Sequence, residues 1–290
     1  MTERRVSVAR SSVLASVLTL VLTVVASGVG LFVPEVYRDA AVLLPQLRGQ
    51  DLLTLTVAAP ALAVSLLAAV RGSRRGYVVW LGVTGYLLYT YASYAFMTTF
   101  NELYLVYVTL FALTLYTFVG GMVRFDATAL KDAVGDHSVA SYVWFLWLAA
   151  VAVGVMWLAD LVPAMLAATV PAVLVGTGLP TPVIQSLDLA VLVPAFVLSA
   201  YWLRHRQPWG YVFTGVLLVK VATLGLAVLA MAGLQIRAGQ LVPLPMILVF
   251  GLVSTIAVVL TGRFVLAIES PEQRSERSRV AQPAGESRVR

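Results

Sequence analysis

Seven residues with reactive or hydrogen-bonding side chains stand inside long apolar stretches of the chain or at their ends. They are Lys220, Asp188, Asp160, Asp51, Glu102, Asn101 and Tyr89. An amine, carboxylates, an amide and a phenol could bind an anionic or carbonyl-bearing ligand, act as a general base, or pair with one another between helices. Which use applies depends on how deeply each residue lies in the apolar sequence around it.

Lys220, one of only two lysines, stands in the middle of the stretch GVLLVKVATLG at residues 215–225. A helix predicted over 209–233 places it about 11 residues, or ~16 Å, from the helix start. A basic residue at the centre of a bilayer costs ~2.5–3.5 kcal/mol and is usually paired or faces water. We therefore expect Lys220 to occupy a polar site between helices.

The expected partner of Lys220 is Asp188, on the preceding predicted helix, which runs in the opposite direction. Asp160 is the second choice. Pro194 would loosen the helix that carries Asp188, which fits a bend around a cavity. Two interpretations stay open for this pair: a purely structural ion pair, or a polar site that binds a ligand.

Three of the acids lie near the starts of predicted helices. For Asp51, Glu102 and Asp188, the helix dipole and the unpaired N-terminal N–H groups favour a carboxylate. Asn101 is expected to cap the helix that follows it. Asp160 lies at the C-terminal end of its predicted helix, where the dipole disfavours an acid, so it needs a partner or open water.

Two tyrosines, Tyr86 and Tyr89, lie too deep in their predicted helix to belong to an interfacial aromatic belt. A buried phenol usually finds a hydrogen-bond partner. These residues therefore indicate a polar interior, and aromatic packing alone is the other interpretation.

The composition identifies the elements that carry these residues. Hydrophobic residues make up 60% of the 290 residues, charged residues only 12%, and the mean hydropathy is +0.90. A soluble domain is about half apolar and a quarter charged, and about 20 apolar residues cross a bilayer core as a helix. The prediction is an all-α polytopic transmembrane helix bundle of about eight spans. The predicted spans are 12–33, 52–70, 77–99, 102–122, 140–161, 186–203, 209–233 and 242–262.

The basic residues divide unevenly between the two sides of such a bundle. With the N-terminus in the cytoplasm, 16 of the 20 fall in inner segments, Arg38, Arg48 and Arg237 fall in outer segments, and Lys220 lies in the membrane. Because basic residues are retained on the cytoplasmic side, we expect a protein of the plasma (inner) membrane with both termini cytoplasmic. Residues 1–268 form the predicted bundle, and the polar stretch 269–290 is a predicted disordered tail.

Missing residues exclude or disfavour several kinds of site. The chain has no cysteine, and therefore no disulfide, thiol or cysteine-bound metal. Neither an HExxH signature nor a nucleotide-binding glycine loop occurs, and both histidines fall in predicted inner loops. We therefore expect no cofactor, no metal site and no nucleic-acid partner. No inverted repeat is evident.

The segment 162–185 is uncharged and contains four prolines, which disfavour a further span. We expect it to form a short helix that either lies at the outer interface or dips into the membrane and caps the bundle.

Three stretches carry a resemblance: GQDLLTLTVAAPALAVSLL, GYLLYTYASYAFMTTFNELYLVYVTLFALTLY and LDLAVLVPAFVLSAYWLRHRQPWGYVFTGVLLVK. Over most of residues 49–225 the chain resembles an uncharacterised family of bacterial multi-pass integral membrane proteins. The resemblance implies that Asp51, Asn101, Asp188 and Lys220 lie in recurrent stretches, and it brings no activity with it. A lysine in a seventh helix is also similar to the Schiff-base lysine of retinal proteins, but here an eighth span follows and the third has no buried carboxylate.

Together these features predict a protein that binds or transports a small ligand through an outward-facing polar pocket with Lys220 at its floor. One alternative is a membrane enzyme that acts on a lipid-linked substrate, with an outer acid as general base. The other is a structural subunit of a membrane complex, whose charges pair with a helix of another membrane subunit. The lipid bilayer is a partner in all three cases.

Overall fold

The computed structural model describes residues 7–268, with the backbone alone at 245 and 246, and every element in that range is helical. The predicted tail 269–290 lies outside the described residues. The α-helices are α1 (Arg10–Phe32), α2 (Leu44–Leu53), α3 (Ala59–Val70), α4 (Arg74–Met97), α5 (Tyr104–Arg124), α6 (Ala127–Val134), α7 (Ala140–Leu166), α8 (Val183–Leu187), α9 (Val193–Arg204), α10 (Pro208–Arg237) and α11 (Leu244–Ala267). The other elements are the π-helices η1 (Thr54–Ala58) and η3 (Asp188–Leu192) and the 3₁₀-helix η2 (Ala172–Leu174).

Seven helical segments in the described range are long and apolar enough to cross a membrane, which confirms the predicted all-α polytopic bundle. α2, η1 and α3 form one such segment, and α8, η3 and α9 form another. The remaining long helix, α4, spans 24 residues and is the least apolar candidate among the eight predicted spans. Most of its residues are buried against other helices, so α4 does not need the apolar surface that lipid contact requires.

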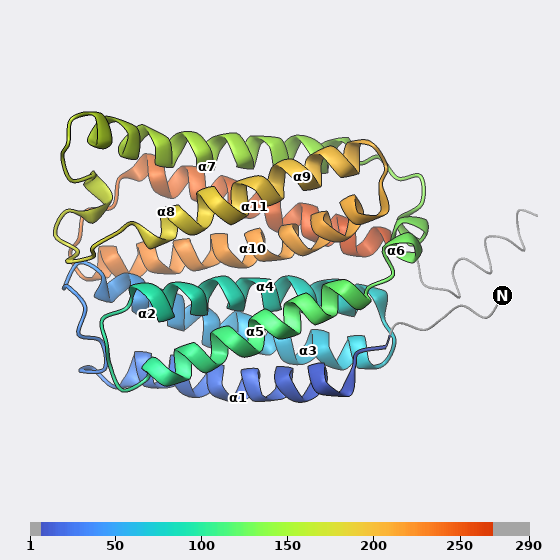
Figure 1. The fold of residues 1–290 in the computed structure, drawn as a ribbon, viewed down its shortest axis with the longest axis horizontal. Coiled ribbons are helices and arrows are strands. Elements are labelled where there is room, and N and C mark those ends of the chain that lie inside the picture. Colours follow the sequence, from blue (N-terminus) through green and yellow to red (C-terminus); the bar gives the residue numbers. More distant parts are fainter. Residues whose placement is uncertain (1–6, 269–290) are drawn as a thin grey trace, which may run out of the picture.

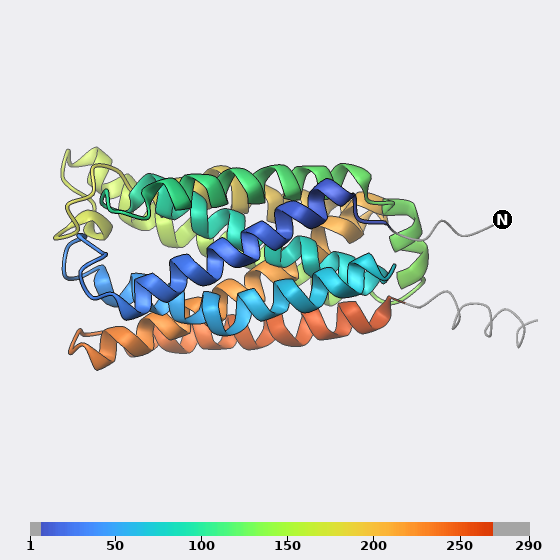
Figure 2. The same ribbon diagram turned by 90° about the horizontal axis from the view of Figure 1, so that it is seen from below.

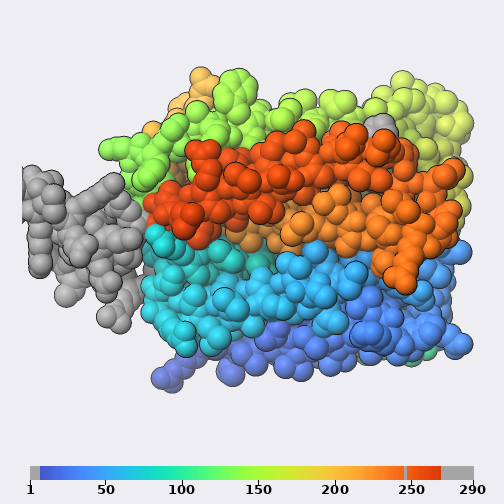
Figure 3. Space-filling model, turned by 180° about the vertical axis from the view of Figure 1, so that it is seen from behind, coloured from blue at the N-terminus to red at the C-terminus, as the bar shows by residue number. Residues whose placement is uncertain are grey.

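The long helices form two groups that lie side by side (Figure 1). The first group runs from α1 to α5 and the second from α7 to α11, with α6 between them at one end of the bundle. The described chain enters α1 and leaves α11 at this same end (Figures 1 and 2), as an even number of crossings requires. α11 packs along α10 and lies on the face of the molecule that points away from the viewer in Figure 1 and toward the viewer in Figure 3.

The two groups repeat one another in the same orientation. Three successive elements of the second group each begin 134 residues after an element of the same kind in the first group. The starts correspond as follows: η3 at Asp188 to η1 at Thr54, α9 at Val193 to α3 at Ala59, and α10 at Pro208 to α4 at Arg74. In this register, residues with identical counterparts include Pro60 and Pro194, Ser65 and Ser199, Gly76 and Gly210, and Tyr77 and Tyr211. The sequence prediction considered only inverted repeats and missed this parallel one.

Equivalent glycines make equivalent close contacts in the two groups. A Cβ added to Gly76 would lie 2.8 Å from the backbone nitrogen of Ala69, and one added to Gly210 would lie 2.3 Å from that of Leu203. Ala69 and Leu203 are themselves counterparts in the 134-residue register. Each glycine therefore allows the same tight approach of two successive helices.

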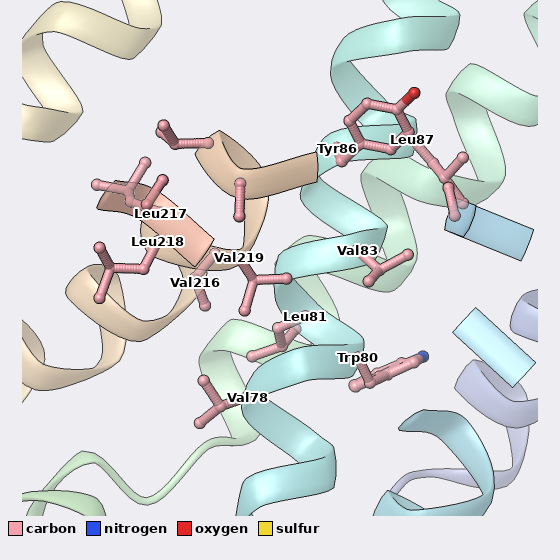
Figure 4. Packing of buried hydrophobic residues seen from close by; sticks show 14 of the residues in the cluster. Val78, Trp80, Leu81, Val83, Tyr86, Leu87, Val216, Leu217, Leu218 and Val219 are labelled. Carbon is pink, nitrogen blue, oxygen red and sulfur yellow. The ribbon is translucent and has the colours of Figure 1, made fainter. Parts of the chain in front are cut away.

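α4 and α10 pack against each other at the centre of the bundle, where the two groups meet. A Cβ at Gly82 would lie 2.6 Å from Cγ1 of Val219, so this glycine lets α10 come close to α4. Val219 lies between the two helices, on the side of Leu81 and Val83 (Figure 4). This contact brings the polar residues of the two helices into one neighbourhood.

Candidate functional site

Lys220 lies on α10 at the interface between the two groups of helices. The residue is only 6% exposed. Its Nζ atom has no hydrogen-bond partner among the described residues. It lies 3.9 Å from the centroid of the Tyr89 ring, which belongs to α4. The ammonium therefore contacts an aromatic face, and its three N–H donors are unused.

The carboxylate of Asp188 lies on the other side of the same tyrosine. The Tyr89 hydroxyl donates to Oδ1 of Asp188 at 2.7 Å, and the Trp157 indole donates to Oδ2 at 2.9 Å. No ion pair within 4.0 Å joins Lys220 to Asp188 in the described range. The predicted direct pair is therefore wrong, because Tyr89 lies between the two charges and links them.

The π-helix η3 places Asp188 at this position. Asp188 is its first residue and follows α8, so it lies five residues after the start of the helical segment Val183–Arg204, deeper than the first turn that the sequence predicted. Pro194 comes two residues after η3, where its missing N–H removes one backbone hydrogen bond. Single π turns inside α-helices are frequent at functional sites. Here the 6% exposed carboxylate at the start of the turn accepts hydrogen bonds from α4 and α7.

The first group of helices has a neutral version of the same arrangement. The counterparts of Asp188 and Lys220 in the 134-residue register are Thr54 and Tyr86. Their hydroxyls lie 3.1 Å apart, and the Gln50 amide donates to Tyr86 at 2.8 Å. The second group therefore carries charges where the first carries hydroxyls, and the polar interior expected around Tyr86 and Tyr89 is present.

Asp51 belongs to a separate polar cluster in the first group. α2 begins at Leu44, so Asp51 is eight residues into the helix and 2% exposed, contrary to the predicted place in a first turn. Its carboxylate accepts hydrogen bonds from the hydroxyls of Tyr37 and Tyr94, the latter at 3.3 Å. The reason for the error is that the predicted loop 34–51 is helical from residue 44 onward.

The other three predicted site residues lie away from Lys220. Asp160 accepts the backbone N–H groups of Ala172 and Val173 at 2.9 and 3.2 Å, so it has the partner that its position required and it holds the loop around η2. Glu102 forms an exposed ion pair with Arg38.

Asn101 does not cap α5 through its side chain, because the helix begins at Tyr104 after the N-cap residue Leu103. Its Oδ1 atom instead accepts the N–H of Leu103 at 2.9 Å and holds the turn before the helix. Its Nδ2 atom is buried without a hydrogen-bond partner among the described residues.

Three residues that bind the predicted carboxylates or their neighbours were not singled out from the sequence: Trp157, Gln50 and Tyr37. Their signal was present, since each is a hydrogen-bond donor inside or beside an apolar segment. A pocket of about 670 Å³ is found at the other end of the bundle. Its lining residues are Lys131, Asp132, Gly135, Asp136, Arg206 and Tyr211. It is separate from the Lys220 site.

Two titratable residues of the loop before α2 are perturbed by burial. Burial raises the pKa of the Asp39 carboxyl, and the hydrogen bond from the Thr99 N–H at 2.9 Å partly offsets this. Burial, followed by the nearby Asp51 carboxylate, raises the pKa of the Tyr37 phenol well above its ordinary range. Tyr37 therefore acts at Asp51 as a neutral donor.

Comparison of the chain with protein-family models, with curated proteins and with solved structures found no match. The resemblance to a family of bacterial multi-pass membrane proteins stays a prediction.

Proposed function

We propose that this protein binds or transports a small ligand that carries an anionic or carbonyl group, and that Lys220 holds that group. The observation that carries the proposal is the buried Nζ atom without a hydrogen-bond partner. A buried donor left unsatisfied costs ~1–3 kcal/mol, and more when it is charged. A ligand oxygen would supply the missing acceptor.

The surroundings of Lys220 favour a ligand site over a structural ion pair. The carboxylate that Tyr89 links to it, that of Asp188, already accepts hydrogen bonds from Tyr89 and Trp157. The Tyr89 ring stabilises the cation through its face and offers no acceptor to the N–H groups at the observed position. The ammonium is therefore held in place while its donors stay free for a ligand.

The parallel repeat supports transport in particular. Parallel repeats related by an axis along the membrane normal are a known transporter architecture, with the substrate site at the interface of the repeats. Lys220 and Tyr89 lie on α10 and α4, the two helices that pack where the groups meet. The two π-helices, each followed by a proline, are places where the segments could bend.

We further propose that the chain lies in the plasma (inner) membrane of a bacterium with both termini cytoplasmic. The uneven distribution of basic residues supports this orientation. The polar site around Lys220 and Asp188 would then face the outer side, because α8, which directly precedes Asp188, lies toward the end of the bundle away from α6 (Figure 1). A reporter fused after Arg290 should respond from the cytoplasm, and a response from the outer side would refute the orientation.

The test of function begins with the melting temperature of the purified protein in detergent, measured with a panel of small carboxylates, phosphates and carbonyl compounds. The compound that stabilises most is then followed into liposomes that contain the protein. Flux that Lys220→Met abolishes and Lys131→Met, the change at the only other lysine, leaves intact would support the proposal. Product formation without flux would support an enzyme instead, and stable co-purification of another membrane protein without ligand binding would support a structural subunit.

A further inference from the structure

The buried carboxylate of Asp51 lies beside a cluster of four tyrosines that come from three parts of the chain. They are Tyr37 of the loop before α2, Tyr91 and Tyr94 of α4, and Tyr107 of α5. Asp51 is 2% exposed, and the rings of Tyr37, Tyr91 and Tyr107 each contact the Tyr94 ring edge-on. The carboxylate is thus enclosed in phenols.

The enclosure is shaped to hold the carboxylate closely. Tyr37 donates to Oδ2 of Asp51, and Tyr94 shares its single hydroxyl proton between Oδ1 of Asp51 at 3.3 Å and the carbonyl of Leu47 at 3.1 Å. On the α1 side, Gly30 leaves the space that the carboxylate fills, because a Cβ there would lie 2.0 Å from Oδ2 of Asp51. The site therefore binds the carboxylate by hydrogen bonds and by shape.

No basic side chain within the described range neutralises Asp51. Arg48, one turn earlier on α2, donates to the carbonyl of Pro34, and Arg38 pairs with Glu102. The helices packed against α2 are α1 and α10, whose basic residues are Arg10, Lys220 and Arg237, and none of these forms an ion pair with Asp51 within 4.0 Å. A negative charge at this depth lacks a counter-ion and would be costly.

Buried polar atoms near the carboxylate have unused hydrogen-bonding capacity. The hydroxyls of Tyr91 and Tyr107 and Nδ2 of Asn101 have no hydrogen-bond partner among the described residues. A phenol can both donate and accept a hydrogen bond. These hydroxyls could therefore rotate to accept from, or donate to, whichever form of the carboxyl group is present.

We propose that Asp51 is a proton-exchange site. The carboxylate takes one proton from a hydronium ion, forming an O–H bond on a carboxyl oxygen and leaving a neutral water molecule. When that bond breaks, the proton passes to a water molecule and hydronium forms again. The tyrosines stabilise both forms, by donating to the carboxylate and by accepting from the carboxylic acid. The proposal does not depend on ligand binding at Lys220, because its test needs no ligand.

Infrared difference spectroscopy of the full chain in liposomes, between about pH 4 and about pH 10, tests this assignment across the ordinary range of carboxyl and phenol titration. The wild type should show a protonated carboxylic C=O band that disappears as the pH rises, and Asp51→Asn should lack it. Glu102→Gln, which removes an exposed carboxylate, should keep it. Tyr37→Phe should keep the band but shift its frequency, because one hydrogen bond is lost.

The outcomes are decisive in either direction. If the spectrum of Asp51→Asn matches that of the wild type, or if Asp51 stays ionised or stays protonated over the whole range, the proposal is overturned. If Asp51→Asn does not fold, the Tyr37→Phe spectrum decides: a shifted band supports the assignment and an unshifted one overturns it.

Discussion

The Nζ atom of Lys220 lies 3.9 Å from the centroid of the Tyr89 ring, and the hydroxyl of that ring donates to Asp188. One tyrosine therefore serves a cation through its face and an anion through its edge. The two charges are linked across the interface of the two helix groups without a direct ion pair. This arrangement leaves the N–H donors of Lys220 available for a ligand.

The two uses of Tyr89 can be separated by substitution. Tyr89→Phe keeps the ring under Lys220 and removes the hydrogen bond to Asp188, so we expect a loss of ~1.5–3 kcal/mol in the free energy of unfolding. Tyr89→Leu also removes the cation–π contact and should cost a further ~1–2 kcal/mol. Reversible unfolding in mixed micelles measures both. Equal losses for the two variants would show that the ring face contributes nothing.

The indirect link between the charges predicts a moderate coupling energy. In a double-mutant cycle of Lys220→Met and Asp188→Asn, we expect a coupling near the lower end of ~0.5–3 kcal/mol, because the residues interact through Tyr89. A direct buried pair would cost ~3–5 kcal/mol on removing either partner alone. If each single variant loses ~3–5 kcal/mol in the free energy of unfolding and the double variant recovers much of that loss, the two charges form a direct pair. If the losses of the two single variants simply add in the double variant, the two residues are not linked.

Gly30 should be intolerant of a side chain because of Asp51. Gly30→Ala places a Cβ 2.0 Å from the carboxylate, so we expect clear destabilisation even though alanine favours a helix. Gly28 lies two residues earlier in the same helix and has open space around it. Gly28→Ala is thus the matched control, with an expected gain of ~0.5–1 kcal/mol. A neutral Gly30→Ala would mean that Asp51 is not held where the structure places it.

The parallel repeat predicts paired effects at equivalent positions. Gly76→Ala and Gly210→Ala should both destabilise the protein, since each added Cβ would meet the backbone of the preceding helix. Gly120→Ala, in α5 with nothing within 4 Å, is the control and should be tolerated. Expression and melting temperature would suffice as measurements. Tolerance at one of the two glycines alone would argue against equivalent packing.

Asp39 gives the loop before α2 a pH dependence of known sign. Burial raises its pKa above the ordinary value of 3.8, so folding favours the protonated form. The stability that this group contributes is fully present below pH 3.8 and is lost as the pH rises through the higher folded pKa. The melting temperature of the wild type, relative to that of Asp39→Asn, should therefore fall as the pH rises from 3.8 through the folded pKa of Asp39. Above that pKa the difference between the two proteins should stay constant. A difference that moves in the opposite direction would contradict the assignment.

Much of this fold could be predicted from the sequence. Long uncharged runs predicted the helices, and the depth of Lys220 predicted a polar site between them. The partner of Lys220 could not be predicted, because it depends on a π turn at Asp188 and on the side of α4 that presents Tyr89. Such features arise from packing between helices and have no local signal.

The position of Asp51 in its helix also could not be predicted from the local sequence pattern. The charged and polar stretch before it resembles a loop, yet residues 44–53 continue the span as a helix. The parallel repeat was readable in principle from Pro60 and Pro194, which lie 134 residues apart. In the fold, the repeat is marked by the two π-helices, which begin 134 residues apart at Thr54 and Asp188.

The most direct test of the central claim is the affinity of the best-stabilising ligand for three forms of the protein, measured by titration calorimetry in detergent. The account predicts that Lys220→Met weakens binding about tenfold to a hundredfold, because a charge-assisted hydrogen bond is worth ~1.5–3 kcal/mol, while Lys131→Met binds like the wild type. If Lys220→Met binds that ligand within about twofold of the wild type, Lys220 does not hold it and the claim is wrong.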